Sequence, residues 1–158
     1  MATLKKEAYL TQIFAYFKNE EYEKAYEFGG EFAGAYPKEM ISHFLLAKVA
    51  FRLKKYEKAA EEARSAFNLA GEPDEMVLCA VLASTAYYQT GEFEKGYELL
   101  EKMKKIKNTW EIERMLFVLS IAKNDSEKAM QHLEHLAAFN KKAAEDLILK
   151  YLSQTEKS

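Results

Sequence analysis

The chain has 158 residues, of which 30% are charged and 49% hydrophobic, and its formal net charge is −2. These values predict one folded domain with a sizeable core, and they exclude a disordered chain. The charge argues against a nucleic-acid-binding protein, because such domains are usually basic. The single cysteine, Cys79, excludes an intramolecular disulfide bond and favours a cytoplasmic location.

No stretch of the chain indicates a membrane or a secretion signal. The apolar run near the N-terminus is interrupted by Thr11 and Gln12 and precedes no small-residue cleavage site. The most apolar stretch, residues 76–88, is too short to span a bilayer and predicts a buried helix instead. We therefore expect no signal peptide and no membrane partner.

Apolar residues recur at helical spacing along the whole chain, and short polar or Gly/Pro-containing stretches interrupt them. Pro37 ends the second predicted helix, because proline cannot continue one. We expect Gly71 to form a left-handed C-cap and Asp74 to be the next N-cap. In chain order the predicted helices are 6–18, 22–36, 39–53, 56–69, 75–89, 93–107, 110–123, 127–139 and 141–153.

A four-residue motif returns through the chain. It consists of an aromatic residue, Glu, Lys and a small residue, and it first occurs as Tyr22-Glu23-Lys24-Ala25. It recurs at Tyr56, at Phe93 and, more weakly, at Ser126, with spacings of 34, 37 and 33 residues. A period in this range is typical of a solenoid built from helix pairs. The small residue allows a close approach of the partner helix.

The repeats resemble the tetratricopeptide repeat family over residues 6–140. The first repeat carries the family pattern at Tyr9, Tyr16, Ala25 and Pro37, and the later repeats carry it at fewer positions. The resemblance implies an all-α, right-handed superhelical solenoid of antiparallel helix pairs. The repeats would span residues 6–39, 40–73, 74–108 and 109–140, and the ninth helix would cap the last pair.

The resemblance also implies a concave groove that binds a segment of a partner protein. In this family the first helix of each repeat lines that groove. The corresponding residues are Leu10, Phe14, Phe17, Phe44, Lys48, Phe51, Arg52, Val81, Thr85, Tyr88 and Arg114. Phe14, Phe51 and Tyr88 would be the anchors, and Lys48, Arg52 and Arg114 would orient an acidic group. The other interpretation is that the phenylalanines pack between helices as core.

Gly29, Gly30 and Gly34 lie inside one predicted helix, where each glycine costs about 1 kcal/mol relative to alanine. Their clustering indicates either close contact with another helix or a kink, and the third option is that the glycines are tolerated drift. The contacting helix would belong either to the same chain or to a second subunit of a homodimer.

Few residues suggest metal binding or catalysis. His132 and His135 share one helix face and could join a metal site. No further ligand cluster lies near them in sequence, so a solvated helix face is the preferred interpretation. We expect His43 to pack at the edge of the core and Cys79 to be buried. The chain contains no phosphate-binding loop, nucleophile elbow or zinc-protease motif.

The sequence therefore predicts a non-catalytic adaptor or scaffold, with no metal and no cofactor. Two alternatives remain. One is a secretion-type chaperone that holds a client protein and dimerises, and the other is a structural module that assembles with itself.

Overall fold

The computed structural model describes residues 3–156 and consists, over that range, of nine α-helices. Connections between them are short turns and loops, and no strand occurs among these residues. The helices are α1 (Lys6–Lys18), α2 (Tyr22–Ala35), α3 (Met40–Arg52), α4 (Tyr56–Leu69), α5 (Pro73–Thr90), α6 (Phe93–Lys104), α7 (Trp110–Ala122), α8 (Ser126–Phe139) and α9 (Lys141–Glu156).

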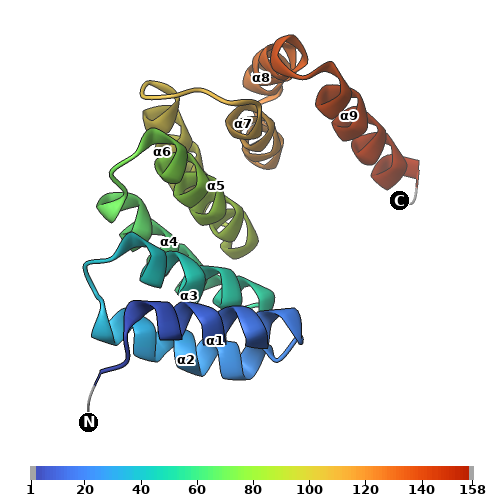
Figure 1. The fold of residues 1–158 in the computed structure, drawn as a ribbon. Coiled ribbons are helices and arrows are strands. Elements are labelled where there is room, and N and C mark those ends of the chain that lie inside the picture. The colour runs from blue at the N-terminus through green and yellow to red at the C-terminus, as the bar shows by residue number, and fades with distance from the viewer. Residues whose placement is uncertain (1–2, 157–158) are drawn as a thin grey trace.

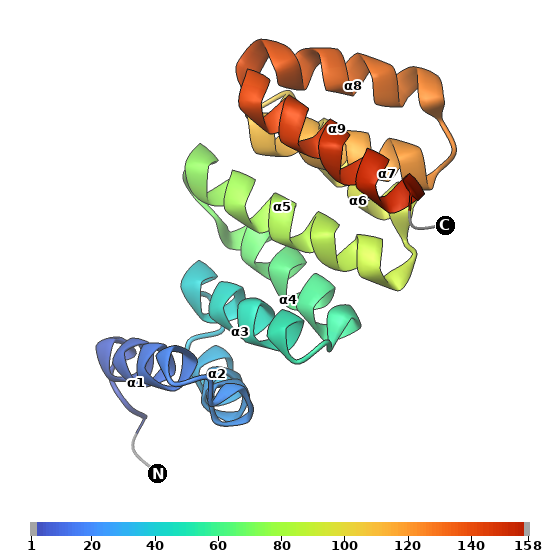
Figure 2. The ribbon, with the colours of Figure 1, turned by 90° about the vertical axis from the view of Figure 1, so that its right-hand side faces the viewer.

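The helices form a curved stack in which each packs against the next along the chain (Figure 1). Contacts also join α3 to α5, α5 to α7 and α7 to α9. These odd-numbered helices therefore form one layer, and Figure 2 shows α3 and α5 side by side within it. The arrangement confirms the predicted all-α solenoid of helix pairs.

The turn that joins the two helices of each pair is the same in all four pairs. Two positions before each repeat motif the backbone is left-handed, with φ of 60° at Glu20, 61° at Lys54, 79° at Gly91 and 61° at Asn124. The next amide donates a hydrogen bond to a carbonyl five residues earlier, for example from Glu21 to Tyr16. This is the Schellman pattern, which satisfies the last carbonyl groups of the helix.

Glu20 is strained by its left-handed backbone, because such a conformation costs an L-residue about 1–2 kcal/mol. We expect Glu20→Gly to raise the free energy of unfolding by about 1 kcal/mol, measured by urea denaturation. The control is Glu27→Gly, which places glycine at an exposed position inside α2 and should lower stability by a similar amount. Equal effects of the two changes would contradict the strain argument.

The small residues of the repeat motif are buried as expected. Ala25, Ala59 and Ala129 are almost inaccessible to solvent. Gly96 takes the same place in the third repeat, where a Cβ would lie 3.2 Å from Leu119 and 3.5 Å from the Ser84 backbone. The second helix of each pair thus approaches its neighbours closely at this point.

Two predictions about helix ends were wrong. The residue after α4 is Ala70 in an extended conformation, and Gly71 does not have a positive φ. The N-cap of α5 is Glu72 rather than Asp74, because Pro73 already occupies the first helical turn. Glu72 and Glu75 form a reciprocal capping box, in which the side chain of each residue accepts a hydrogen bond from the backbone amide of the other.

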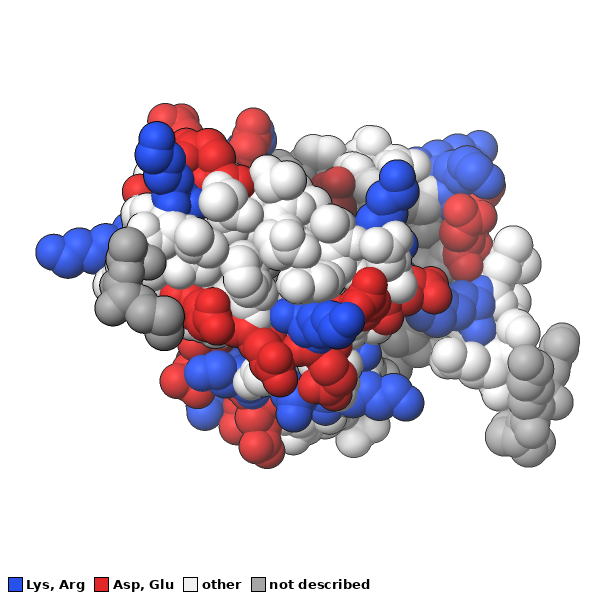
Figure 3. Space-filling view, turned by 60° about the horizontal axis from the view of Figure 1, so that its bottom comes forward, with Lys and Arg blue, Asp and Glu red and all other residues white. Residues whose placement is uncertain are grey.

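The three glycines of α2 have different surroundings. Gly29 is buried, and a Cβ there would lie 3.4 Å from Leu46 of α3, so the close contact is with a helix of the same chain. Gly30 and Gly34 are exposed, and a Cβ at either would have no neighbouring helix of the described chain within 4 Å. Figure 3, which turns this N-terminal end of the stack forward, shows a band of uncharged residues bordered by charged ones. Contact of Gly30 and Gly34 with a second subunit stays a prediction.

The last helix, α9, is only partly a cap. Ala144 and Leu147 are buried against α8 and α7. Ile148, Leu149 and Leu152 are 41%, 63% and 56% exposed, so an apolar strip faces outward. No helix in the described range combines the length and the apolar character that a membrane crossing requires.

Candidate functional site

A groove of about 600 Å³ lies between α3 and α5. Six predicted groove residues line it, namely Phe44, Lys48, Phe51, Arg52, Val81 and Thr85. The lining is completed by Lys54, Tyr56, Val77, Leu78, Leu82 and Glu111. Helical spacing explains the convergence, because residues four and seven apart share one face of α3 and likewise of α5.

The floor and walls of this groove are apolar. Val77 is buried, whereas Leu78 is 59% exposed. The Phe51 ring is half-buried and meets the Tyr56 ring edge-on at a centroid distance of 5.1 Å. Phe44 and Phe51 also pack against the central core cluster. The groove and core interpretations of these two rings are therefore compatible, since each ring serves both.

Two cations of the groove lie over aromatic rings, one within the groove and one beside it. The Lys48 ammonium lies 5.9 Å from the Phe44 ring centroid. The Arg52 guanidinium lies 5.5 Å from the Phe17 centroid and 5.9 Å from that of Tyr22. Both side chains are exposed, and neither takes part in the ion pairs found between described residues. The groove can therefore offer positive charge to a ligand.

A second, smaller cavity of about 240 Å³ lies next to the groove, and Thr85 lines both. Predicted residues Tyr88 and Arg114 lie here. Lys150 of α9 also contributes, which the sequence did not suggest because α9 was interpreted as a cap. The lining of the first groove by Leu78 and Leu82 could have been found, since Leu78 lies three residues before Val81 and Leu82 three residues before Thr85.

Three predicted residues lie outside both cavities. Leu10 is half-buried against the cluster formed by Tyr9, Ile13 and Phe32. Phe17 lies beneath Arg52, beside the groove. Phe14 is 56% exposed on α1 and lines neither cavity. The cavities thus take their lining mainly from α3, α5, α7 and α9, with Tyr56 of α4 and Lys54 of the preceding turn, rather than from α1.

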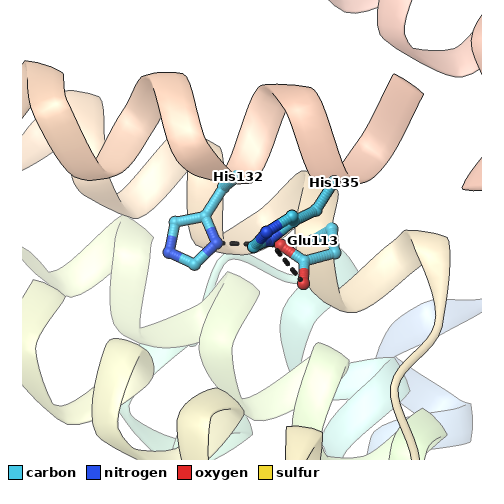
Figure 4. Close-up of side chains that lie close together, drawn as sticks. All are labelled: Glu113, His132 and His135. Atoms are coloured by element: carbon cyan, nitrogen blue, oxygen red, sulfur yellow. Dashed lines mark hydrogen bonds and ion pairs between the residues drawn. The ribbon is translucent and has the colours of Figure 1, made fainter. Parts of the chain in front are cut away.

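The prediction that His132 and His135 lie on a solvated helix face is wrong for His132. His132 is buried, with Nδ1 2.8 Å from Oε2 of Glu113 and Nε2 2.8 Å from the Tyr97 hydroxyl. His135 is half exposed, and its Nδ1 lies 3.5 Å from Oε1 of Glu113 (Figure 4). The carboxylate comes from α7, nineteen residues before His132, so no local sequence pattern pointed to it.

Glu113 is fully buried and ionised. Burial pushes its pKa upward, but hydrogen bonds from His132, Lys104 and Asn108 outweigh that effect and lower the pKa to about 2. The Lys104 ammonium lies 2.8 Å from Oε1 of Glu113, and the Asn108 amide nitrogen lies 2.9 Å from it. Glu113, His132 and His135 form a group whose ligand atoms all lie within 4.8 Å of one another.

The remaining polar side chains singled out in the sequence are structural. His43 is half-buried at the edge of the core, where Nδ1 lies 2.6 Å from Glu62 and Nε2 donates to the Pro37 carbonyl at 2.7 Å. Cys79 is buried, as predicted, and burial together with the Glu75 carboxylate raises the pKa of its thiol to about 12. Such a thiol is a poor nucleophile at neutral pH.

Comparison with known proteins supports the repeat architecture. A family model described as anaphase-promoting complex, cyclosome, subunit 3 matches residues 2–67. No curated protein matches the sequence. The solved structure of MamA aligns with a TM-score of 0.75 at 17% identity, covering 89% of this chain and 76% of that one.

Two further solved structures have the same fold. PilF from Pseudomonas aeruginosa aligns with a TM-score of 0.71 at 18% identity, covering 94% of this chain and 69% of that one. A double mutant of MamA RS-1 aligns with a TM-score of 0.72 at 12% identity, covering 99% of this chain and 98% of that one. At these identities the likeness concerns the fold. The matches show the fold, a solenoid of stacked helix pairs, and the repeat motif within it resembles that of the tetratricopeptide repeat family.

Proposed function

We propose that the chain is a non-catalytic scaffold that holds a segment of a partner protein in the groove between α3 and α5. The observation that carries this proposal is the combination, in one groove, of a largely apolar lining with the cations Lys48, Arg52 and Lys54, none of which forms an ion pair among the described residues, against a single carboxylate, Glu111. A fold of this repeat type suits protein–protein interaction. We further propose that the four repeats and α9 act as one cytoplasmic domain that takes no nucleic-acid partner.

The mechanism is the presentation of a preformed surface. The groove lies between helices that are fixed by their own core contacts, so little conformational entropy is lost when a ligand binds. Val77, Leu82 and the Phe51 ring would receive apolar side chains of the ligand, and Lys48 or Arg52 would pair with an acidic group beside them. A helical or extended segment with this composition fits the site.

The alternative of self-assembly has one specific observation in its favour. Ile148, Leu149 and Leu152 leave an apolar strip exposed on α9, at the end of the solenoid. A module that stacks on itself would cover that strip. For the chaperone alternative, the exposed Gly30 and Gly34 would be the place of dimer contact.

The test is a selection of random peptides on the full chain, paired with light scattering of the unliganded protein. We expect selected peptides to combine an apolar or aromatic residue with Asp or Glu, and to lose binding when Leu78 is changed to Asp. Leu78 is exposed, so this variant should keep its helical circular dichroism. A concentration-dependent oligomer, with no peptide that is sensitive to Leu78, would favour self-assembly instead.

A further inference from the structure

The cluster formed by Glu113, His132 and His135 has the composition of a metal site. A carboxylate and two imidazoles are ligands that zinc and related divalent transition metals prefer. His132 and His135 lie three residues apart, so both rings leave α8 on one face and meet the carboxylate of α7 there (Figure 4). The two helices pack against each other, which fixes the donors on a common scaffold.

The spacing of the donors permits one shared ion. In a tetrahedral zinc site with bonds of about 2.0–2.2 Å, neighbouring ligand atoms lie about 3.4 Å apart. The three donors now lie within 4.8 Å of one another: Glu113 Oε2 lies 2.8 Å from Nδ1 of His132, and Glu113 Oε1 lies 3.5 Å from Nδ1 of His135. His135 is half exposed, so its ring can rotate to close the remaining distance.

The surroundings of His132 suit a ligand as well. A histidine that binds a metal through Nδ1 must carry its proton on Nε2, and that proton needs an acceptor. The Tyr97 hydroxyl oxygen lies 2.8 Å from Nε2 and can accept it. Tyr97 would then fix the tautomer and the orientation of the ring without touching the ion.

A second, independent observation lies beside the cluster. The Asn108 side-chain oxygen is buried and has no hydrogen-bond donor among the described residues. Its amide nitrogen donates to Glu113, so the orientation of the side chain is set by that bond. A buried acceptor without a donor costs about 1–3 kcal/mol, and a nearby cation or its bound water would satisfy it.

In this structure the Lys104 ammonium provides the positive charge that pairs with the Glu113 carboxylate. Its ammonium lies 2.8 Å from Oε1, and its side chain is 26% exposed at the end of α6. Lys104, Asn108 and His135 also line a surface cavity of about 310 Å³, which provides an entry path. The ion would exchange with the ammonium, which can move into water, so the carboxylate would never be left unpaired.

We propose that Glu113, His132 and His135 bind one divalent transition-metal ion, with zinc as the best match, in competition with Lys104. The ion would join α7 to α8 and so stabilise the fourth helix pair. The proposal is independent of the groove between α3 and α5, because the two sites share no residue.

The test is titration of the untagged, chelator-treated full chain with zinc chloride at neutral pH, by calorimetry and thermal unfolding. We expect one ion per chain and a raised melting temperature. Removing the His135 ligand with His135→Ala should weaken affinity by about tenfold or more. Lys104→Met should instead tighten binding by about tenfold, because it removes the competing cation. Glu134→Ala, an exposed carboxylate on the same helix, is the matched control and should change nothing.

Cobalt substitution gives a second readout, since tetrahedral cobalt absorbs visible light only when it is bound in such a site. His135 and Lys104 are both partly exposed, so these variants should fold, and circular dichroism checks this. The proposal is overturned by the absence of saturable binding. It is equally overturned by zinc binding that is unchanged in His135→Ala, or by a Lys104→Met variant that binds no more tightly.

Discussion

Glu113→Gln should lower the free energy of unfolding by about 3 kcal/mol, because removing one partner of a buried ion pair leaves the others uncompensated. Glu113 is fully buried, and His132, Lys104 and Asn108 all lie within 2.9 Å of its carboxylate. Glutamine has nearly the same shape, but it carries no charge to pair with Lys104. A loss of this size corresponds to a melting temperature that is lower by about 10 °C.

The measurement is thermal and urea unfolding in the presence of a chelator, so that any bound metal is excluded. Glu134→Gln is the matched control, because Glu134 is exposed on α8 and should contribute less than about 0.5 kcal/mol. Lys104→Met, alone and combined with Glu113→Gln, completes a double-mutant cycle. The cycle isolates the interaction free energy of the Glu113–Lys104 ion pair. A change in Glu113→Gln as small as that of the control would mean that the network does not stabilise the fold.

The helices that should lose stability in Glu113→Gln can also be predicted. Stability in a stacked-repeat protein is approximately a sum over repeats and their interfaces. The network joins α6, α7 and α8, so Glu113→Gln should increase amide hydrogen exchange in those helices first. Exchange in α1 and α2 should change little, since neither contacts the network.

Arg52→Glu should weaken the binding of an acidic peptide with an apolar anchor by about a hundredfold. Reversing a charge that faces the ligand removes one attraction and adds a repulsion, and a hundredfold loss equals about 2.7 kcal/mol. Arg52 is exposed, and its guanidinium lies over the Phe17 and Tyr22 rings. The cost in stability should therefore be about 1 kcal/mol, far smaller than the effect on binding.

Fluorescence anisotropy of a labelled peptide from the selection measures this effect, at low and at physiological salt. Arg64→Glu on α4 is the control, because Arg64 lies outside the groove and its reversal changes the net charge equally. If both variants lose affinity to the same extent, the effect is one of overall charge and the groove is not the binding site. If neither does, the ligand does not use Arg52.

The sequence located the helices well because their signals are local. Apolar residues at helical spacing and the repeat motif placed the starts of α2, α4 and α6 at Tyr22, Tyr56 and Phe93, where the structure has them. The repeat period also predicted the pairing of the helices. Helix ends were less certain, as Glu72 shows, since several polar residues near Pro73 could serve as the cap.

Half of the groove could also be predicted. Residues of α3 and α5 converge because each set shares a helix face, and a regular solenoid places those faces side by side. The contribution of Lys150 to the second cavity could not be predicted, since it depends on how far α9 turns back over α7. For Phe14, the family resemblance implied a place in the groove like that of Phe44, but the groove does not extend to α1.

The sequence by itself thus determined the helix pairs, the repeat period, the buried small residues and the cationic face of α3. The helices and the cationic face of α3 follow from residues within one or two turns of each other, and the helix pairs follow from a motif that recurs every 33 to 37 residues. Only the tertiary structure brought Glu113, at the start of α7, against His132 and His135 of α8 and Lys104 of α6. The burial of that carboxylate, its low pKa and its ring of donors arise from the packing of three helices, which no local pattern records.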